Sequence, residues 1–269
     1  MLNITQPTLS GQVKELEERY GTKLFLRHGR RIELTDIGKS AHAITRQLFR
    51  HEEEVEQLLQ SARALTSGQL RVGADSPYIA TPLLAQFQRL YPGIRISIQY
   101  GNSQQLMLWL QSRRCDVAFL PNIPPEDTHL YTITLAPGQL VAFVSQDHEW
   151  AERRSVTIDE IVTQRIILRE KGSRTRSIFE DAVNRAGHIL DDVMEISGRE
   201  GVNEAVAAGF GVGIVAKSEL LADSRLRALA ISDADLEYSE FVACLNETRS
   251  LRVTDAFLEM VRTRQKEAG

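Results

Sequence analysis

The sequence predicts an α/β protein in three parts: a basic N-terminal segment, a long helix, and a body with two lobes of alternating strands and helices. Three observations carry this prediction. Residues 1–50 hold nine Lys and Arg against five Asp and Glu, a heptad pattern spans residues 37–65, and strand and helix patterns alternate from residue 69 onward. Residues 51–269 hold 23 Lys and Arg against 31 Asp and Glu, so a basic end joins an acidic body. We expect domains at residues 1–35, 36–67 and 68–269.

A helix is expected directly after Thr5, whose hydroxyl can cap it, with a proline in the first turn. Leu9, Val13 and Leu16 follow at the spacing of one helix face. The other face carries polar side chains that can reach base edges and phosphates in the major groove of double-stranded DNA. The expected DNA-binding residues of this helix are Gln6, Pro7, Thr8, Ser10, Gln12 and Lys14.

A helix-turn-helix needs a helix before its recognition helix, and only Met1 to Ile4 precede this one. We therefore expect an N-terminally shortened regulator, in which Met1 is a misplaced start or an artificial boundary. The alternative is a shortened chain that dimerises and binds its ligand but does not bind DNA productively.

Residues 24–34 predict two short strands around a glycine turn. Directly after a recognition helix, such a hairpin is typical of the wing of a winged helix-turn-helix, here a partial one. Arg27, Arg30 and Arg31 lie at its tip, where they can contact DNA phosphates without reading sequence. The alternative is a basic hairpin that only faces solvent.

A long helix is expected from about Asp36 to Leu65, capped by Thr35 and ended by Ser67-Gly68. Its apolar seam keeps heptad spacing, which favours a dimer through this linker helix. His51, within the seam, is expected to set the register rather than bind a ligand. The alternative is a helix that packs on its own domain. The seam positions are Ile37, Ala41, Ile44, Leu48, His51, Val55, Leu58, Ala62 and Leu65.

From residue 69 the pattern predicts two similar α/β halves joined by crossing strands, a hinged architecture like that of periplasmic binding proteins. We expect lobe I at about residues 68–144 and 236–269, and lobe II at about residues 145–235. Strands are expected at 70–74, 94–100, 115–120, 140–144, 165–168, 193–196, 212–215 and 241–245. Helices are expected at 81–91, 103–113, 175–186, 203–208 and 253–264.

Small polar residues follow the expected strands where helices begin, and converging helix N-termini select anions such as phosphonate, phosphate or carboxylate. The expected effector-binding residues are Asp75, Ser76, Asn102, Ser103, Asn122, Ser173, Arg174, Thr175 and Glu200. Ser76 and Ser103 can instead be simple helix caps, and Asn122 a turn residue. Arg176 is expected in a surface ion pair. For a zwitterionic ligand, Asp75 or Glu200 would meet the ammonium group.

The sequence does not favour an enzyme. It contains no nucleophile elbow, no phosphate-loop lysine motif and no zinc-protease motif, and the glycines at 209–213 follow a helix rather than a strand. Its six histidines are dispersed, and Cys115 and Cys244 form no metal-type pair, so we expect no cofactor, no metal and structural thiols.

Nothing in the sequence resembles a signal peptide, because no apolar segment near residue 1 is followed by a small-residue cleavage site, and the most apolar run, at 205–216, is too short to span a bilayer. A cytoplasmic protein with no membrane partner is expected. An exported solute-binding protein of the same two-lobed architecture would need a signal peptide and no DNA-binding end.

Four segments in this order resemble LysR-type transcriptional regulators: Thr-Gln-Pro-Thr-Leu-Ser at 5–10, Leu-Phe-Leu-Arg at 24–27, Leu-Thr-Asp-Ile-Gly at 34–38 and Leu-Arg-Val-Gly at 70–73. The resemblance implies a dimer or tetramer that binds a promoter inverted repeat and responds to a small effector between the lobes. The chain departs from the family by its late start and at Gly11, where many members carry a basic residue.

A narrower resemblance concerns 74–78 (Ala-Asp-Ser-Pro-Tyr), 101–103 (Gly-Asn-Ser), 197–200 (Ser-Gly-Arg-Glu) and 242–245 (Val-Ala-Cys-Leu). These segments are similar to the LysR-type subgroup associated with 2-aminoethylphosphonate catabolism. The subgroup implies that compound as the candidate effector.

Overall fold

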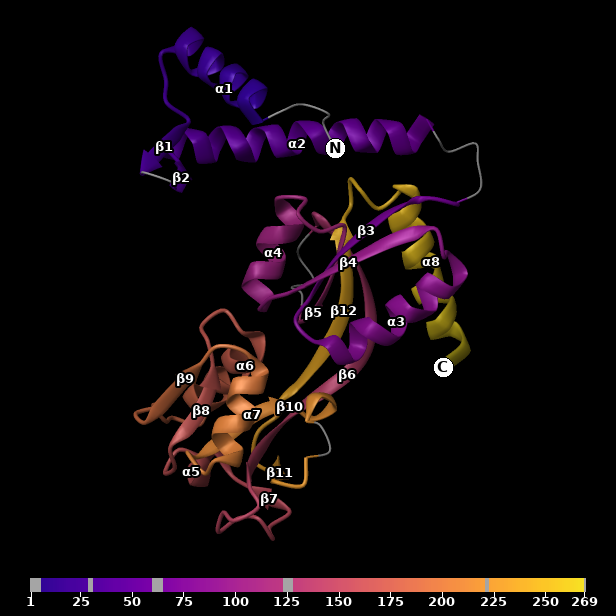
Figure 1. The fold of residues 1–269 in the computed structure, drawn as a ribbon. Helices are drawn as coiled ribbons and strands as arrows, with labels where there is room; N and C mark the ends of the chain where they lie inside the picture. Colours follow the sequence, from indigo (N-terminus) through magenta and orange to yellow (C-terminus); the bar gives the residue numbers. More distant parts are fainter. Residues whose placement is uncertain (1–5, 29–30, 60–64, 123–127, 221–222, 269) are drawn as a thin grey trace. The chain divides into compact units, whose positions relative to one another are not determined.

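A computed structural model describes residues 6–28, 31–59, 65–122, 128–220 and 223–268 of the chain (Figure 1). The chain divides into two compact units, which meet in sequence between Leu59 and Gln60. The expected domain boundaries near residues 35 and 67 remain predictions. Within the described residues, no helix combines the length and apolar character that crossing a bilayer requires.

The first unit contains helix α1 (Gln6–Tyr20), strands β1 (Phe25–His28) and β2 (Arg31–Leu34), and the long helix α2 (Asp36–Leu59). β1 and β2 pair antiparallel, which confirms the expected hairpin. Thr35 Oγ1 accepts a hydrogen bond from the Gly38 N–H at 2.9 Å, which confirms the expected cap of α2. The expected cap Thr5, and the part of the long helix expected at 60–64, lie outside the described residues.

The heptad seam of α2 lies largely exposed in the single chain. Four of its apolar side chains are more than half exposed, namely Ile37 (58%), Ile44 (67%), Leu48 (65%) and Val55 (53%). No described part of the first unit covers them, so packing within this unit does not account for the seam. The side chain of Leu58 and all of Ala62 lie outside the described residues.

The second unit is built on one mixed sheet with the strand order β4-β3-β5-β12-β6-β10-β8-β9. We call the part that surrounds β3 lobe I. β3 pairs parallel with both β4 and β5, which confirms the expected βαβαβ arrangement. Lobe I contains β3 (Gly68–Ala74), α3 (Pro77–Leu90), β4 (Ile94–Tyr100), α4 (Ser103–Gln111), β5 (Val117–Pro121) and α8 (Arg252–Ala268).

Lobe II repeats the alternation, with β8 parallel to both β9 and β10. The short pieces β7 and α5, and the strand β11 beside β6, were not expected from the sequence. Lobe II contains β7 (Ser155–Val156), α5 (Ile158–Ile161), β8 (Ile166–Arg169), α6 (Arg174–Arg185), β9 (Val193–Ile196), α7 (Arg199–Ala207), β10 (Val212–Ala216), the 3-10 helix η2 (Lys217–Glu219) and β11 (Leu226–Ile231).

Two long strands, β6 (Leu130–Ser145) and β12 (Glu237–Leu245), cross between the lobes (Figure 1). Residues 130–139 of β6 pair with β12, whereas residues 140–145 pair with β10 and β11. The pairing of β12 with β6 shifts at a bulge between Glu240 and Phe241. Each lobe has buried clusters of its own, so the crossing strands join two separately packed bodies.

Several helices begin earlier than expected. Helix α3, expected from residue 81, begins at Pro77, which lies in the first turn where proline is favoured, and Pro82 lies inside the helix. Likewise α7 begins at Arg199 rather than at residue 203. Neither N-cap residue, Ser76 or Gly198, makes a side-chain capping hydrogen bond, so side-chain capping does not set these starts.

Candidate functional site

Helix α1 presents the expected DNA-contacting side chains to solvent. Thr8, Ser10, Gln12 and Lys14 are all exposed, and Lys14 forms an exposed ion pair with Glu18 at 3.4 Å. Leu9 and Leu16, which share the predicted apolar stripe, are also 48% and 46% exposed. The other expected DNA-binding residues lie outside the described part of the structure, namely the side chains of Gln6, Pro7, Arg27 and Arg31 and all of Arg30.

Glu17 fastens the wing hairpin to α1. Its carboxylate accepts hydrogen bonds from Lys23 Nζ (2.9 Å) and from the backbone N–H groups of Leu24 (2.8 Å) and Phe25 (3.0 Å). The bond from Lys23 and the two backbone bonds lower the pKa of Glu17 to about 2. Nothing in the local sequence distinguishes Glu17 from the glutamates beside it, so only the fold shows its role.

Two cavities lie between the lobes of the second unit. Cavity A, of about 490 Å³, is lined by four of the expected effector residues, Ser103, Asn122, Ser173 and Arg174. Gln104 and Lys171, which the sequence did not indicate, line it as well. Cavity B, of about 430 Å³, is lined by the expected Asp75, Asn102 and Glu200, together with Tyr100, Arg169, Glu170 and Arg199.

Cavity A contains polar groups with unused hydrogen-bonding capacity. Ser173 is the N-cap residue of α6, yet its side chain makes no capping hydrogen bond, so the first-turn N–H groups keep their capacity. Arg174 Nε and Ser103 Oγ are shielded from solvent and have no hydrogen-bond partner among the described residues. A partly buried guanidinium, a hydroxyl and a helix N-terminus together suit an anion.

Asn102 separates the two cavities and corrects one expectation. Its Oδ1 accepts from the Gln105 N–H at 3.0 Å, so Asn102, not Ser103, caps α4. Its Nδ2 donates to Glu170 Oε1 of lobe II at 3.1 Å. Beside this contact, the Gln104 N–H donates to the Gly172 carbonyl at 3.3 Å. The lobes are thus in direct contact at the middle of the cleft.

Other expected residues lie elsewhere. Ser76 is only 1% exposed and lines neither cavity, and its hydroxyl makes no capping bond within the described structure. Thr175 also lines neither cavity, but borders a narrow space behind them. Asn122 has a positive φ of 45°, and its Oδ1 accepts from the Ser239 N–H at 2.9 Å, as the turn interpretation requires.

Arg176 forms the expected ion pair, but in a buried position rather than at the surface. It is 9% exposed and binds Glu180 at 2.7 Å and Glu195 at 2.6 Å. Its Nη1 also donates to the Arg169 carbonyl at 2.9 Å. These contacts hold α6 against β8, so Arg176 supports the wall of cavity A.

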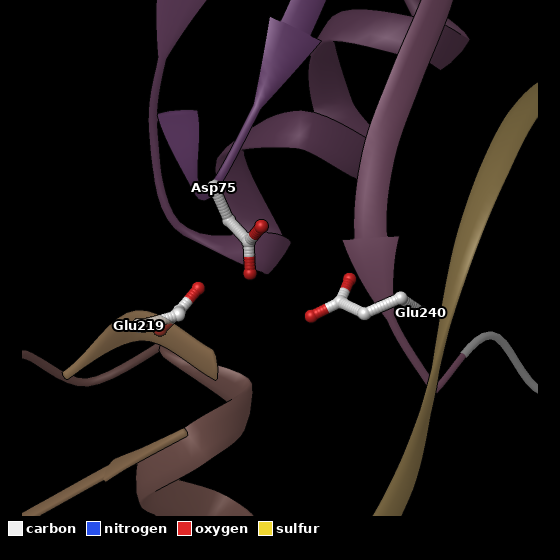
Figure 2. A group of neighbouring side chains, drawn as sticks. All are labelled: Asp75, Glu219 and Glu240. Atoms are coloured by element: carbon white, nitrogen blue, oxygen red, sulfur yellow. The ribbon is translucent and has the colours of Figure 1, made fainter. Parts of the chain in front are cut away.

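Behind the cavities, three carboxyl groups meet where the lobes join (Figure 2). We call Asp75, Glu219 and Glu240 the carboxyl cluster; one oxygen from each lies within 4.8 Å of the others. Burial, and after it the neighbouring carboxyls, raise the pKa of Asp75 to about 7 and that of Glu240 to about 9. The sequence suggested only Asp75, because the three residues lie on elements far apart in the chain.

Known proteins share both units. The model of the LysR substrate binding domain matches residues 63–266, and that of the bacterial regulatory helix-turn-helix protein, lysR family, matches residues 1–39. The HTH-type transcriptional activator CmpR of Synechocystis sp. is 29% identical over 236 residues, which are 87% of this chain and 77% of CmpR.

Two solved structures show the same architecture. The regulatory domain of CcmR from Synechocystis PCC6803, in complex with 2-PG, is 26% identical, with a TM-score of 0.67 over 74% of this chain and 98% of that one. Full-length CbnR in complex with its target DNA is 19% identical, with a TM-score of 0.73 over 97% of this chain and 91% of that one. The chain belongs to the LysR family of bacterial helix-turn-helix transcriptional regulators.

Proposed function

We propose that this LysR-family regulator binds a small anionic effector in cavity A, and that the effector holds the two lobes together. One observation carries the proposal. Ser103 of lobe I and Arg174 of lobe II both line cavity A, and Ser103 Oγ and Arg174 Nε have no hydrogen-bond partner in the described structure. An anion between them would satisfy both groups at once, and only when the lobes are closed.

The charges around cavity A support an anion rather than a neutral ligand. Lys171, Arg174, Arg176 and Glu180 line it, and Glu180, the acidic residue among these four, is already paired with Arg176. The N-terminus of α6 adds about half a positive charge. CcmR, with its bound 2-PG, supports the same class of effector by similarity.

The narrower choice of 2-aminoethylphosphonate gains no support from the relatives described above. Its ammonium group would need an anion, and Asp75 and Glu200 line cavity B rather than cavity A. The compound would therefore have to span the contact between Asn102 and Glu170. The compound is therefore one of the ligands in the binding test below.

Thermal unfolding of the full chain tests the effector site. The ligands are inorganic phosphate, 2-PG, 2-aminoethylphosphonate and acetate, each compared with the free protein. Binding at ~100 times the dissociation constant adds about 2.7 kcal/mol, which moves the midpoint by several degrees. Arg174→Ala should abolish the shift, whereas Arg185→Ala, at the far end of α6, should keep it.

No shift with any of these anions would exclude cavity A as an anion site while leaving the family unchanged. An unchanged shift in Arg174→Ala would place the anion elsewhere. Glu200→Gln tests whether the protein recognises the ammonium group of a zwitterionic effector. It should weaken the binding of 2-aminoethylphosphonate but not that of phosphate.

We further propose that two copies join along the α2 seam and that their α1 helices read an inverted repeat in promoter DNA, in the cytoplasm. Pairing of such dimers would give a tetramer. The exposed Thr8, Ser10, Gln12 and Lys14 are the candidates for base and phosphate contacts.

A gel-shift assay tests DNA binding separately from the ligand assay. Ligand binding without DNA binding would favour the alternative of a dimeric effector-binding chain that does not bind DNA productively.

A further inference from the structure

The carboxyl cluster joins parts of the unit that must move if the lobes separate. Asp75 follows β3 in lobe I, and Glu219 ends η2 in lobe II. Glu240 lies at the bulge of β12, one of the two crossing strands. Figure 2 shows the three carboxyl groups pointing toward one another. Opening of the cleft would therefore change the distances between them.

Among the described residues, Arg199 is the cation that forms an ion pair with a member of this cluster. Arg199 binds Glu219 at 2.7 Å, and the two side chains are 7% and 3% exposed. Its other contact goes to the main-chain carbonyl of Asp75, at 3.3 Å, and not to the carboxylate. Arg169 also faces the cluster but is paired with Glu170 at 2.8 Å. Three carboxylates would thus leave excess negative charge in a buried place.

Protons can remove this excess. Asp75 Oδ1 is shielded from solvent and has no hydrogen-bond partner among the residues described, so it can share a proton with a neighbouring carboxyl. The raised pKa values of Asp75 and Glu240, about 7 and about 9, agree with this arrangement. The remaining titratable neighbour, Tyr238, stays neutral because burial raises its pKa.

A bound metal ion accounts less well than protons for how the negative charge of the carboxyl cluster is neutralised. The space between the three carboxyl groups has no room for a water molecule. Mg²⁺ and Ca²⁺ take about six to eight oxygen ligands, several of which are usually waters. Arg199 already occupies one side of the cluster, at Glu219. Protons need no such space.

We propose that closing the two lobes takes up protons at the carboxyl cluster, so that the balance between closed and open lobes depends on pH near neutrality. At high pH the ionised carboxylates repel one another across the junction and favour opening. If the proposed effector site is correct, the effector then binds more tightly at lower pH; this last clause alone rests on the proposed function.

The sign of the stability effect follows from the direction of the shifts. Both carboxyls have a higher pKa in the fold than the ordinary values of 3.8 for Asp75 and 4.5 for Glu240. Their protonation therefore stabilises the fold fully below about pH 4. That stabilisation is lost as the pH rises through about 7 and then about 9.

Thermal unfolding of the ligand-free full chain tests the proposal. The chain has two tryptophans, Trp109 and Trp150, both in the second unit, so their fluorescence follows that unit alone. The midpoint should fall by roughly 5–10 °C between about pH 5.5 and about pH 9. Glu240→Gln, which cannot ionise, should remove the part of this fall that occurs above about pH 8, and Asp75→Asn should remove the larger part around about pH 7. Glu237→Gln, exposed on the same strand, should keep the wild-type profile.

A distance measurement shows whether the lobes themselves move. Spin labels on Leu108→Cys in lobe I and Ile189→Cys in lobe II use side chains that are 57% and 78% exposed. The native Cys115 and Cys244 are buried. The labelled chains are diluted with unlabelled protein so that the two labels on one chain are measured. The distance between these two labels should be longer at about pH 9 than at about pH 6. In Glu240→Gln, the shorter distance should persist at both pH values.

Asp75→Asn provides a second test should Glu240→Gln fail to fold. A wild-type pH profile in either variant would overturn the proposal. So would a rise of the midpoint with Mg²⁺ or Ca²⁺ at about pH 8.5 that Glu240→Gln abolishes. That result would show that a cation, rather than protons, neutralises the cluster.

Discussion

Asn102 Nδ2 donates to Glu170 Oε1 at 3.1 Å, so the residue that caps α4 in lobe I also holds the end of β8 in lobe II. The same carboxylate accepts from Arg169 and from the Gly198 N–H. Burial alone would raise the pKa of Glu170, but these hydrogen bonds outweigh it and lower the pKa to about 2. The contact is therefore charge-assisted, and it divides the cleft into cavities A and B.

Asn102→Asp should break this contact without removing the helix cap. Aspartate caps helices as well as asparagine does, but its carboxylate would face the ionised Glu170. The Gln104 N–H, bonded to the Gly172 carbonyl across the cleft, should then exchange faster with solvent. Hydrogen-exchange mass spectrometry of the peptides that contain α4 measures this.

Asn102→Ala is the matched control, because it removes the cap as well as the contact. The first turn of α4 should then lose protection too, since loss of an N-cap costs about 1 kcal/mol. Unchanged exchange at Gln104 in Asn102→Asp would show that the contact does not hold the lobes together.

Gly172→Ala should disturb cavity A through both strain and crowding. Gly172 has φ +93°, and an added Cβ would lie 2.7 Å from Gln104 Oε1 and 3.2 Å from Gln104 Cβ. Gly187 has φ +85° with nothing within 4 Å of an added Cβ. Gly187→Ala therefore carries the backbone strain alone, about 1–2 kcal/mol.

Comparison of the two variants isolates the effect of crowding between the added Cβ and Gln104. Both variants should lower the midpoint of urea unfolding, monitored by tryptophan fluorescence, and Gly172→Ala should lower it more. Only Gly172→Ala should also change the protection of Gln104 in hydrogen exchange. Equal behaviour would mean that the Gln104 side chain moves aside at no cost.

Local signals explain which parts of the fold were predictable. β4 and β9 were predicted with their observed bounds, because each is rich in Ile or Val with a turn signal before it. β11 was missed because Leu-Arg-Ala-Leu-Ala-Ile favours a helix as much as a strand; pairing with β6 and β7 makes it a strand. β6 continues through Pro137-Gly138, where Gly138 leaves room for the Tyr238 ring.

The residues of the candidate site, like the elements of the fold, were predictable only where the local sequence carries a signal. Polar residues at strand ends, such as Ser103 and Arg174, were brought to one cavity, as the geometry of parallel sheets predicts. Glu219 and Glu240 carry no comparable signal, because their environment is made by the junction of the two lobes. Asn102 shows a third case: the position was expected, but its double role as cap and bridge depends on tertiary contacts.

Arg199→Ala should be strongly destabilising. It leaves Glu219, 3% exposed, without its ion-pair partner in a cluster that already holds excess negative charge. Removal of one partner of a buried pair costs about 3–5 kcal/mol. Urea unfolding followed by tryptophan fluorescence should show a loss of this size.

Arg225→Ala is the control variant. Like Arg199, Arg225 forms ion pairs, here with Glu204 and Asp223, but its side chain is 48% exposed. Solvent screens such pairs, so the unfolding midpoint should barely move. The loss in Arg199→Ala should also shrink at low pH, where protonation removes the unpaired charge. A pH-independent loss would indicate that Arg199 acts through packing alone.

Leu48→Glu should weaken self-association of the chain. Leu48 lies at a seam position of α2 and is 65% exposed in the single chain, so a partner helix would bury it. A glutamate there would bring two like charges together in the apolar seam. Sedimentation velocity at micromolar concentration should show a shift toward smaller species. Gln47→Glu, one residue off the seam, adds the same charge and should keep the wild-type distribution. An equal shift in both variants would indicate general charge repulsion, and no shift in Leu48→Glu would remove the seam as the dimer interface.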